Sequence, residues 1–238
     1  DFNTNVCFYT DYVLSRVVNS TYKKNIGWLI EPPSINPNGY RQAVELKDKF
    51  DLIFTYSQEL ISSDPEKFKW YPHSGCWIND SDIKIHDKSN LLSIIASNKT
   101  MTSGHKLRHD VIKEFGSSMD VFGRGIKDLP YKLDGLSSYM FSIVIENIKY
   151  DDYFTEKIID CFASGTVPIY WGTKSVKNFF NEEGIIFFET IEELGDILYN
   201  LKEEDYTSRV DAIKYNLNKS EEFILAEDWI FKNYPNFF

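Results

Sequence analysis

Residues 140–172 read MFSIVIENIKYDDYFTEKIIDCFASGTVPIYWG, and this stretch holds the clearest folding unit of the chain. It begins with a nearly continuous apolar run of strand length, Met140–Ile145, and then passes through a polar loop. The next segment, TEKIIDCFASG, has helical spacing of its apolar residues and ends at Gly165. A second apolar run, Val167–Trp171, follows at once. The order strand, helix, strand predicts two parallel strands joined by a crossover helix.

The preceding segment repeats this order. An apolar run (LLSIIASN, 91–98) leads through a helical pattern (HKLRHDVIKEFG, 105–116) into a further run (MDVFGRG, 119–125). Helical stretches also occur at Ile191–Leu201 and Tyr206–Phe223. Two successive units of this kind predict a nucleotide-binding half of Rossmann type, which begins near residue 89.

The amino-terminal half is less regular. Its strand-length runs, Ile26–Ile30 and Leu52–Tyr56, are separated by the turn-rich segments EPPSINPNG (31–39) and SSDPEKF (62–68). We therefore expect an α/β protein with two Rossmann-type halves facing a cleft, of which the amino-terminal half is reduced. The expected boundaries are an amino-terminal domain at 1–88, a carboxy-terminal domain at 89–225 and a tail at 226–238.

Composition narrows the class of partner. The chain has 36 acidic and 26 basic residues, so it offers no broad positive surface to nucleic acid, which we exclude as a partner. No apolar run approaches the roughly 20 residues that span a bilayer, which predicts a chain without a transmembrane segment.

The three cysteines lack the spacing of a disulfide framework or a zinc site. We expect a soluble, cytoplasmic protein, and the abundance of Lys, Ile and Asn suggests a microbial or viral source.

The loop 146–153 lies at the carboxyl end of a predicted strand and leads into a helix, whose free N–H groups favour an anion. Lys157 in the first helical turn opposes the helix dipole by roughly 0.3–1 kcal/mol unless a negative group is present. A diphosphate would supply that charge. Glu156 could accept hydrogen bonds from ribose hydroxyls, and Asn147 and Tyr153 offer polar and stacking contacts. An ordinary capped helix with a solvated Glu-Lys pair explains the spacing equally well.

The same stretch resembles the family 10 glycosyltransferases, the α-1,3-fucosyltransferases. Their pattern is close to F-x-x-x-x-E-N-x-x-x-x-D-Y-x-T-E-K, followed by a small-residue helix end and V-P-[IV]-x-x-G. The matching residues are Phe141, Glu146, Asn147, Asp152, Tyr153, Thr155, Glu156, Lys157, Val167, Pro168 and Gly172. The resemblance implies a GT-B-like fold and an inverting enzyme that moves fucose from GDP-fucose to a hydroxyl of a glycan acceptor. It also implies that no cofactor or metal is required.

In that family, the positions matching Asn147, Tyr153, Glu156 and Lys157 bind the guanine nucleotide donor, and we add Glu146 and Thr155 of the same pattern to the expected donor-binding residues. Upstream, SNKTMTSGHKLRHDVIKEF (97–115) resembles the segment in which an arginine contacts the donor phosphates, which implies this role for Arg108. VFGRG (121–125) resembles a family turn that places Arg124 near the cleft. Arg108 and Lys157 would then stabilise the departing diphosphate, which makes Arg108 a catalytic candidate.

Inverting transfer also requires a base for the acceptor hydroxyl. The segment WLIEPPSINPNGY (28–40) resembles the family motif E-S-P-x-x-x-P, which makes Glu31 the candidate base. Its alternative role is to cap the turn before Pro32 and Pro33. By the same resemblance, Tyr71 and His73 in KWYPHSG (69–75) are weaker candidates for the border of the acceptor site.

Other classes remain as alternatives. A metal-dependent transferase could use Asp80 and Asp82, and His105 and His109 have the i, i+4 spacing of zinc ligands, but a solvated loop and a surface helix face explain these residues better. No G-x-G-x-x-G follows a strand, which disfavours a dinucleotide oxidoreductase. A transferase for another GDP-sugar and a non-catalytic nucleotide- or carbohydrate-binding module of the same fold stay open.

Overall fold

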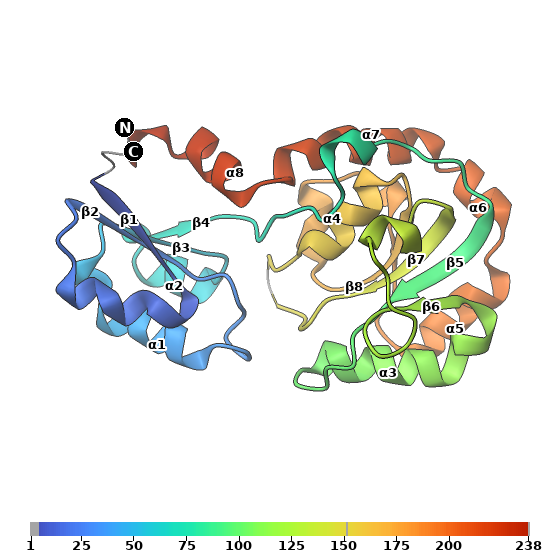
Figure 1. Ribbon diagram of the computed structural model, residues 1–238, viewed down its shortest axis with the longest axis horizontal. Coiled ribbons are helices and arrows are strands. Elements are labelled where there is room, and N and C mark those ends of the chain that lie inside the picture. Colours follow the sequence, from blue (N-terminus) through green and yellow to red (C-terminus); the bar gives the residue numbers. More distant parts are fainter. Residues whose placement is uncertain (1–4, 151, 238) are drawn as a thin grey trace. The chain divides into compact units, whose positions relative to one another are not determined.

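The computed structural model describes residues 5–150 and 152–237, and the chain divides into two compact units. The first comprises Asp1–His73, Tyr150–Tyr153 and Ala226–Phe238, and the second comprises Ser74–Lys149 and Phe154–Leu225. Each unit has its own parallel sheet, so the predicted α/β class is confirmed (Figure 1). The first change of unit falls between His73 and Ser74, before the boundary expected at residue 88, and the expected tail is part of the first unit.

The first unit is built on a four-stranded sheet in the order β1-β2-β3-β4, with every pairing parallel. Its strands are β1 (Val6–Thr10), β2 (Lys24–Trp28), β3 (Leu52–Thr55) and β4 (Phe68–Trp70). Its helices are η1 (Asp11–Asn19), α1 (Pro37–Glu45), η2 (Lys47–Lys49), α2 (Gln58–Ser63), α8 (Ala226–Asn233) and η9 (Pro235–Phe237), where η marks a 3-10 helix. The core includes Leu14, Ala43 and Ile53, which are fully buried.

The second unit has a five-stranded parallel sheet in the order β6-β5-β7-β8-β9. Its strands are β5 (Asn90–Ile95), β6 (Asp120–Phe122), β7 (Tyr139–Ile145), β8 (Val167–Trp171) and β9 (Ile186–Phe187). The α-helices are α3 (Ser103–Phe115), α4 (Glu156–Ala163), α5 (Ile191–Asn200), α6 (Glu203–Thr207) and α7 (Val210–Ser220). Short 3-10 helices are η3 (Asp80–Asp82), η4 (Gly116–Ser118), η5 (Lys132–Gly135), η6 (Lys174–Asn178), η7 (Glu182–Gly184) and η8 (Glu221–Phe223).

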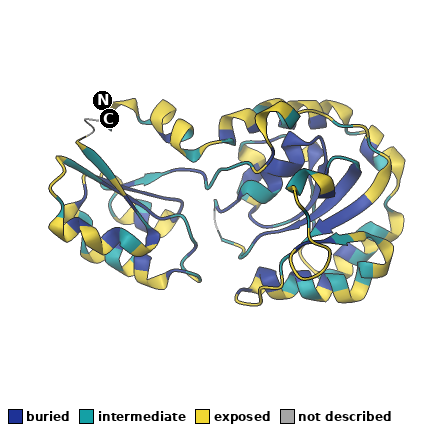
Figure 2. Cartoon of the chain, viewed as in Figure 1, coloured by how far each residue is buried: buried dark blue, intermediate teal, exposed yellow. Residues whose placement is uncertain are grey.

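Strand β7 lies between β5 and β8 and is buried at every residue, which explains its nearly continuous apolar sequence (Figure 2). The chain runs from β5 to β6 on one side and then returns to β7 on the other, so β5 and β7 flank the point where the strand order reverses. In open parallel sheets, ligands bind at the carboxyl ends of the strands at such a point. Helices α3 and α4 begin in the segments that follow these two strand ends.

Helix boundaries depart from the sequence pattern in one place. The stretch expected to be helical at 206–223 is divided into α6, α7 and η8. Helix α6 ends at Thr207, and the hydroxyl of its C-cap, Ser208, donates to the carbonyl of Asp205 at 3.2 Å. A serine side chain that bonds nearby backbone in this way competes with continuation of the helix.

Candidate functional site

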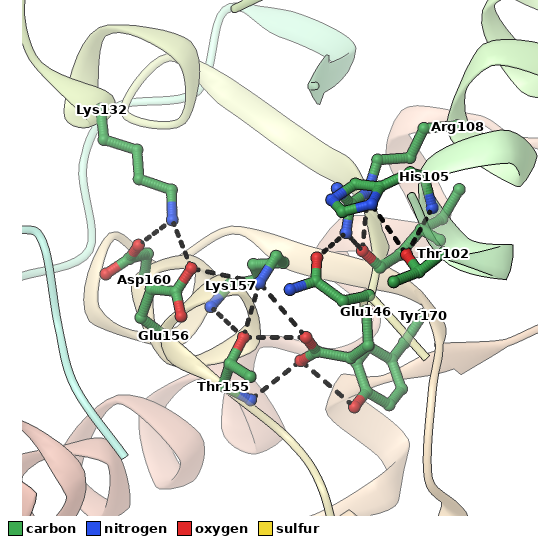
Figure 3. Close-up of polar contacts among 12 residues, drawn as sticks. Thr102, His105, Arg108, Lys132, Glu146, Thr155, Glu156, Lys157, Asp160 and Tyr170 are labelled. Atoms are coloured by element: carbon green, nitrogen blue, oxygen red, sulfur yellow. Dashed lines mark hydrogen bonds and ion pairs between the residues drawn. The ribbon is translucent and has the colours of Figure 1, made fainter. Parts of the chain in front are cut away.

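The start of helix α3 is in direct contact with the end of strand β7. The N–H of Gly104 donates to the carbonyl of Asn147 at 3.0 Å. A Cβ atom at Gly104 would lie 1.8 Å from the carbonyl oxygen of Glu146, so only glycine allows this approach. The contact brings the side chains of the α3 start and of the β7 end into one cluster (Figure 3).

Glu146 is the centre of this cluster and is fully buried. Its Oε1 accepts from the backbone N–H of Thr155 at 2.9 Å, and its Oε2 accepts from the Thr155 hydroxyl at 2.8 Å. The hydroxyl of Tyr170 donates to Oε1 at 3.5 Å. Thr155 is also the N-cap of α4, since its Oγ1 accepts from the Lys157 N–H at 3.4 Å. The buried carboxylate therefore fixes the start of α4 against the end of β7.

Lys157 has negative partners inside the protein. Its Nζ lies 3.4 Å from Oε2 of Glu146 and 3.2 Å from Oε1 of Glu156, and it donates to the Thr155 hydroxyl at 2.9 Å. These carboxylates offset the unfavourable position of a cation in the first helical turn, so that position does not by itself require a bound diphosphate. The Lys157 side chain is 22% exposed, which leaves part of it accessible to a ligand.

Arg108 extends from α3 to the end of β7. It is 5% exposed, and its Nε donates to the carbonyl of Ile145 at 2.9 Å. Its Nη2 donates to the same carbonyl and to Oδ1 of Asn147 at 3.0 Å. The guanidinium of Arg108 thus orients the Asn147 side chain.

His105 adds a neutral ring to this cationic region. Its Nδ1 lies 2.8 Å from the hydroxyl of Thr102, which also accepts the His105 N–H as the N-cap of α3. Burial, followed by the positive charge of Arg108 and of nearby lysines, lowers the pKa of His105 to about 4. The ring is therefore uncharged at neutral pH.

A second ion-pair network, which the sequence analysis missed, reaches the same helix start. Lys132 of η5 pairs with the fully buried carboxylate of Asp160 and lies 3.9 Å from Oε1 of Glu156 (Figure 3). Burial lowers the pKa of Lys132, but the carboxylates outweigh that effect and the net direction is upward. Oδ1 of Asp160 accepts the backbone N–H of Trp77 at 2.7 Å. Glu156 is thus flanked by two lysines, Lys132 and Lys157.

The candidate base, Glu31, belongs to the first unit and is held through its backbone. Oδ1 of Asp11 accepts the N–H groups of Ile30 at 2.9 Å and of Glu31 at 3.2 Å. Asp11 is 8% exposed and has a positive φ of 37°. Asp11 follows β1 and Glu31 lies just beyond β2, and the parallel pairing of these two strands brings the two residues to the same end of the sheet. Asp11 was not predicted, because β1 is not evident from the sequence.

The aromatic candidates of the first unit are packed rather than exposed. Tyr71 is 1% exposed and donates to the carbonyl of Leu29 at 2.8 Å. Tyr153 is also 1% exposed, and its ring lies 5.1 Å from that of Tyr56 and 5.5 Å from that of His73. Tyr153 therefore does not present an open stacking face, and it lies in a different unit from Glu156 and Lys157.

Comparison with known proteins places this geometry in a family. Residues 85–210, more than half of the chain, match the family model described as glycosyltransferase family 10 (fucosyltransferase) C-term. The chain belongs to this family. The resemblance seen in residues 146–172 is therefore confirmed, and the buried Glu146 and its capping partner Thr155 lie within the matched region.

Known relatives of this family 10 chain are fucosyltransferases. It is 41% identical over 71 residues to the alpha-(1,3)-fucosyltransferase FucT of Helicobacter pylori, and the aligned region covers 30% of this chain and 14% of that protein. It is 22% identical over 216 residues to 4-galactosyl-N-acetylglucosaminide 3-alpha-L-fucosyltransferase 9 of Mus musculus, which covers 87% of this chain and 56% of that protein. The chain thus matches only about half, or less, of the length of these relatives.

Solved structures show the same fold. An alpha1,3-fucosyltransferase crystallised with GDP-fucose has a TM-score of 0.55 and 15% identity, over 92% of this chain and 90% of that chain. Such neighbours are GT-B glycosyltransferases, which confirms the predicted fold class. Residues 5–150 and 152–237 contain no helix that is both long enough and apolar enough to cross a bilayer.

The remaining candidates are Arg124, which lies outside the cluster around Glu146, and the histidine pair His105 and His109, which lacks the geometry of a metal site. Arg124 is exposed in the turn after β6. His109 is paired through Nε2 with the carbonyl of Lys99 at 3.0 Å, whereas His105 is paired with Thr102. Within the described part of the chain, no three His, Cys, Asp or Glu side chains are arranged to hold a metal ion.

Proposed function

We propose that this chain is an α-1,3-fucosyltransferase, with GDP-fucose as donor and a glycan hydroxyl as acceptor. The observation that carries the proposal is the cluster around Glu146. Lys157 at the start of α4 pairs with Glu146, and Arg108 of α3 donates to the carbonyl of Ile145, the residue before Glu146. Two helix starts and two cations form a region that favours a diphosphate. The family, and a structural neighbour solved with GDP-fucose, support this donor.

In this proposal the second unit is the donor half. The side chain of Lys157 binds the diphosphate at the start of α4, and Glu156 accepts hydrogen bonds from the ribose hydroxyls. Arg108 orients Asn147 and contributes positive charge to the leaving group, while Glu146 and Thr155 hold the helix start in place. Preorganised charge of this kind stabilises the phosphate as it departs, without a reorganisation cost during the reaction. Arg124 and Tyr153 remain predictions from the resemblance.

The first unit is the acceptor half. Glu31 removes the proton from the acceptor hydroxyl while the oxygen attacks C1 of fucose, the C1–O bond to GDP breaks, and the electron pair leaves with the diphosphate. A single displacement of this kind inverts the configuration at C1. Asp11 holds the Glu31 backbone by accepting its N–H. By the name of the mouse relative, the acceptor we propose is a 4-galactosyl-N-acetylglucosaminide.

The first experiment is a thermal-shift screen of GDP-fucose, GDP-mannose, UDP-galactose and UDP-glucose, followed by transfer assays on 4-galactosyl-N-acetylglucosamine. We expect stabilisation by GDP-fucose and formation of a fucosylated product. Lys157→Ala should weaken GDP binding, and Glu31→Gln should abolish transfer while it leaves GDP binding unchanged. Lys177→Ala, at an exposed lysine of η6, is the matched control for charge. Stabilisation by UDP-sugars alone would contradict the proposed donor, and donor binding without turnover would indicate a non-catalytic module.

A further inference from the structure

The second unit has a groove of about 430 Å³ that has no role in the transfer chemistry described above. Two large aromatic side chains line it and remain accessible: Trp77 is 73% exposed and Tyr131 is 68% exposed. Asn79, Asp82 and Asp134 add amide and carboxylate groups to its lining. Aromatic rings of this size are normally buried, so two exposed rings in one concave surface indicate a binding site.

The groove is formed by segments tied to helix α4. The backbone N–H of Trp77 is held by Oδ1 of the fully buried Asp160. On the other side, Lys132 adjoins Tyr131 and pairs with the same Asp160 carboxylate. The buried carboxylate of Asp160 therefore holds both segments that carry the exposed rings, one through a hydrogen bond and the other through an ion pair.

The chemistry of the lining selects the kind of ligand. Flat apolar rings pack against the C–H faces of pyranose sugars, and amide and carboxylate groups accept or share hydrogen bonds with their hydroxyls. Among the described residues that line the groove, Lys132 is the only cation, and it is already paired with Asp160 and Glu156. The carboxylates of Asp82 and Asp134 disfavour a phosphate or other anion. A neutral saccharide matches the groove better than a nucleotide does.

We propose that this groove of the second unit is a glycan subsite, which binds a neutral oligosaccharide of the acceptor class. The inference rests on the proposed function for the identity of the glycan. Through Lys132 and Glu156, the groove shares an ion-pair network with the start of α4. The groove gives the chain a preference for extended acceptors over a single disaccharide unit.

The test compares Trp77→Ala and Tyr131→Ala with the unchanged full chain. The probes are the disaccharide 4-galactosyl-N-acetylglucosamine and its two- and three-repeat oligomers. Direct binding is measured by saturation-transfer NMR and calorimetry without donor, and GDP binding is measured separately. Tyr199→Ala is the matched control, because Tyr199 is a 91% exposed aromatic residue on α5 of the same unit. Since all three rings are exposed, their removal leaves the core intact.

We expect the three-repeat oligomer to bind at least tenfold more tightly than the disaccharide. Each groove variant should reduce that advantage by about fivefold or more, while GDP affinity and disaccharide binding stay unchanged. Equal oligomer binding by the groove variants and by Tyr199→Ala would overturn the subsite. Weaker GDP binding in Trp77→Ala or Tyr131→Ala would also overturn it, because the groove would then hold the nucleotide. Because binding is measured without donor, absence of fucose transfer would count against the proposed function alone.

Discussion

The hydroxyl of Thr155 offers the sharpest test of how the donor helix is held. Thr155→Val keeps the shape of the side chain but removes three interactions. These are the donor to Oε2 of Glu146 at 2.8 Å, the acceptor for Nζ of Lys157 at 2.9 Å and the N-cap of α4. The backbone N–H of Thr155 would still donate to Glu146, so the carboxylate keeps one of its two contacts with this residue.

The expected cost can be worked out from these contacts. Loss of an N-cap costs roughly 0.5–2 kcal/mol, and a hydrogen bond to a charged group contributes about 1.5–3 kcal/mol. Because Glu146 is fully buried, water cannot replace the lost donor. The two effects share one hydroxyl and are not fully additive, so we expect a loss of about 2–4 kcal/mol in the free energy of unfolding. For a unit of this size that is a fall in Tm of roughly 5–15 °C.

The control is Thr155→Ser, which keeps the hydroxyl and removes only one methyl group, at a cost of about 1 kcal/mol. Urea unfolding followed by far-UV circular dichroism, with the transition of the second unit fitted separately, gives the free energies. GDP affinity should fall in the valine variant and be retained in the serine variant. Equal stability of the two variants would refute the reasoning, because the hydroxyl would then contribute nothing to the support of Glu146.

Three further predictions test other contacts. Gly104→Ala should cost about 3 kcal/mol or more in unfolding experiments, because its Cβ would lie 1.8 Å from a backbone carbonyl, whereas Gly116→Ala meets only side-chain atoms at 3.5 Å or beyond and should be nearly neutral. The pKa of His105 is lowered to about 4 in the folded state, so its contribution to stability is complete above about pH 6.5 and is lost as the pH falls toward 4. His105→Gln should therefore flatten the dependence of the unfolding free energy on pH in that range, and the idea fails if His109→Gln flattens it equally. Asp11→Ala should cost about 2–4 kcal/mol by thermal unfolding, because two N–H groups lose their acceptor and alanine tolerates a φ of 37° poorly, and an equal loss for Asp11→Asn would contradict this account.

The fold was predictable from the sequence where a strand is apolar throughout and lies inside a sheet. Strands β5, β7 and β8 are expected from their apolar runs, because buried parallel strands are apolar on both faces. Strand β1 was missed because VCFYT mixes exposed and buried positions, and β9 was missed because it has only two residues. Both lie at a sheet edge, where packing selects residues less strictly.

The candidate site was predictable only in part. The pattern in residues 146–157 gave the donor cluster, and the structure brings Glu146, Thr155 and Lys157 into contact. Lys132 could not be found in this way, because its partner Asp160 is distant in sequence and only the tertiary fold places them together. The sequence also suggested an open stacking role for Tyr153, whose ring is instead buried. A spacing pattern specifies neighbours along one segment, but burial depends on every segment that packs against it.

The short segment Tyr150–Tyr153 belongs to the first unit, although the residues on both sides of it belong to the second. Helix α8 likewise returns to the first unit, where Trp229 packs against Trp70 with ring centroids 5.1 Å apart. The two units therefore cannot be exchanged between proteins by a single junction in the sequence. In a hybrid joined after residue 73, the first-unit sheet would come from one parent, whereas Tyr150–Tyr153 and α8 of the same unit would come from the other. Engineering of a new acceptor preference by exchange of halves would have to move all three segments together.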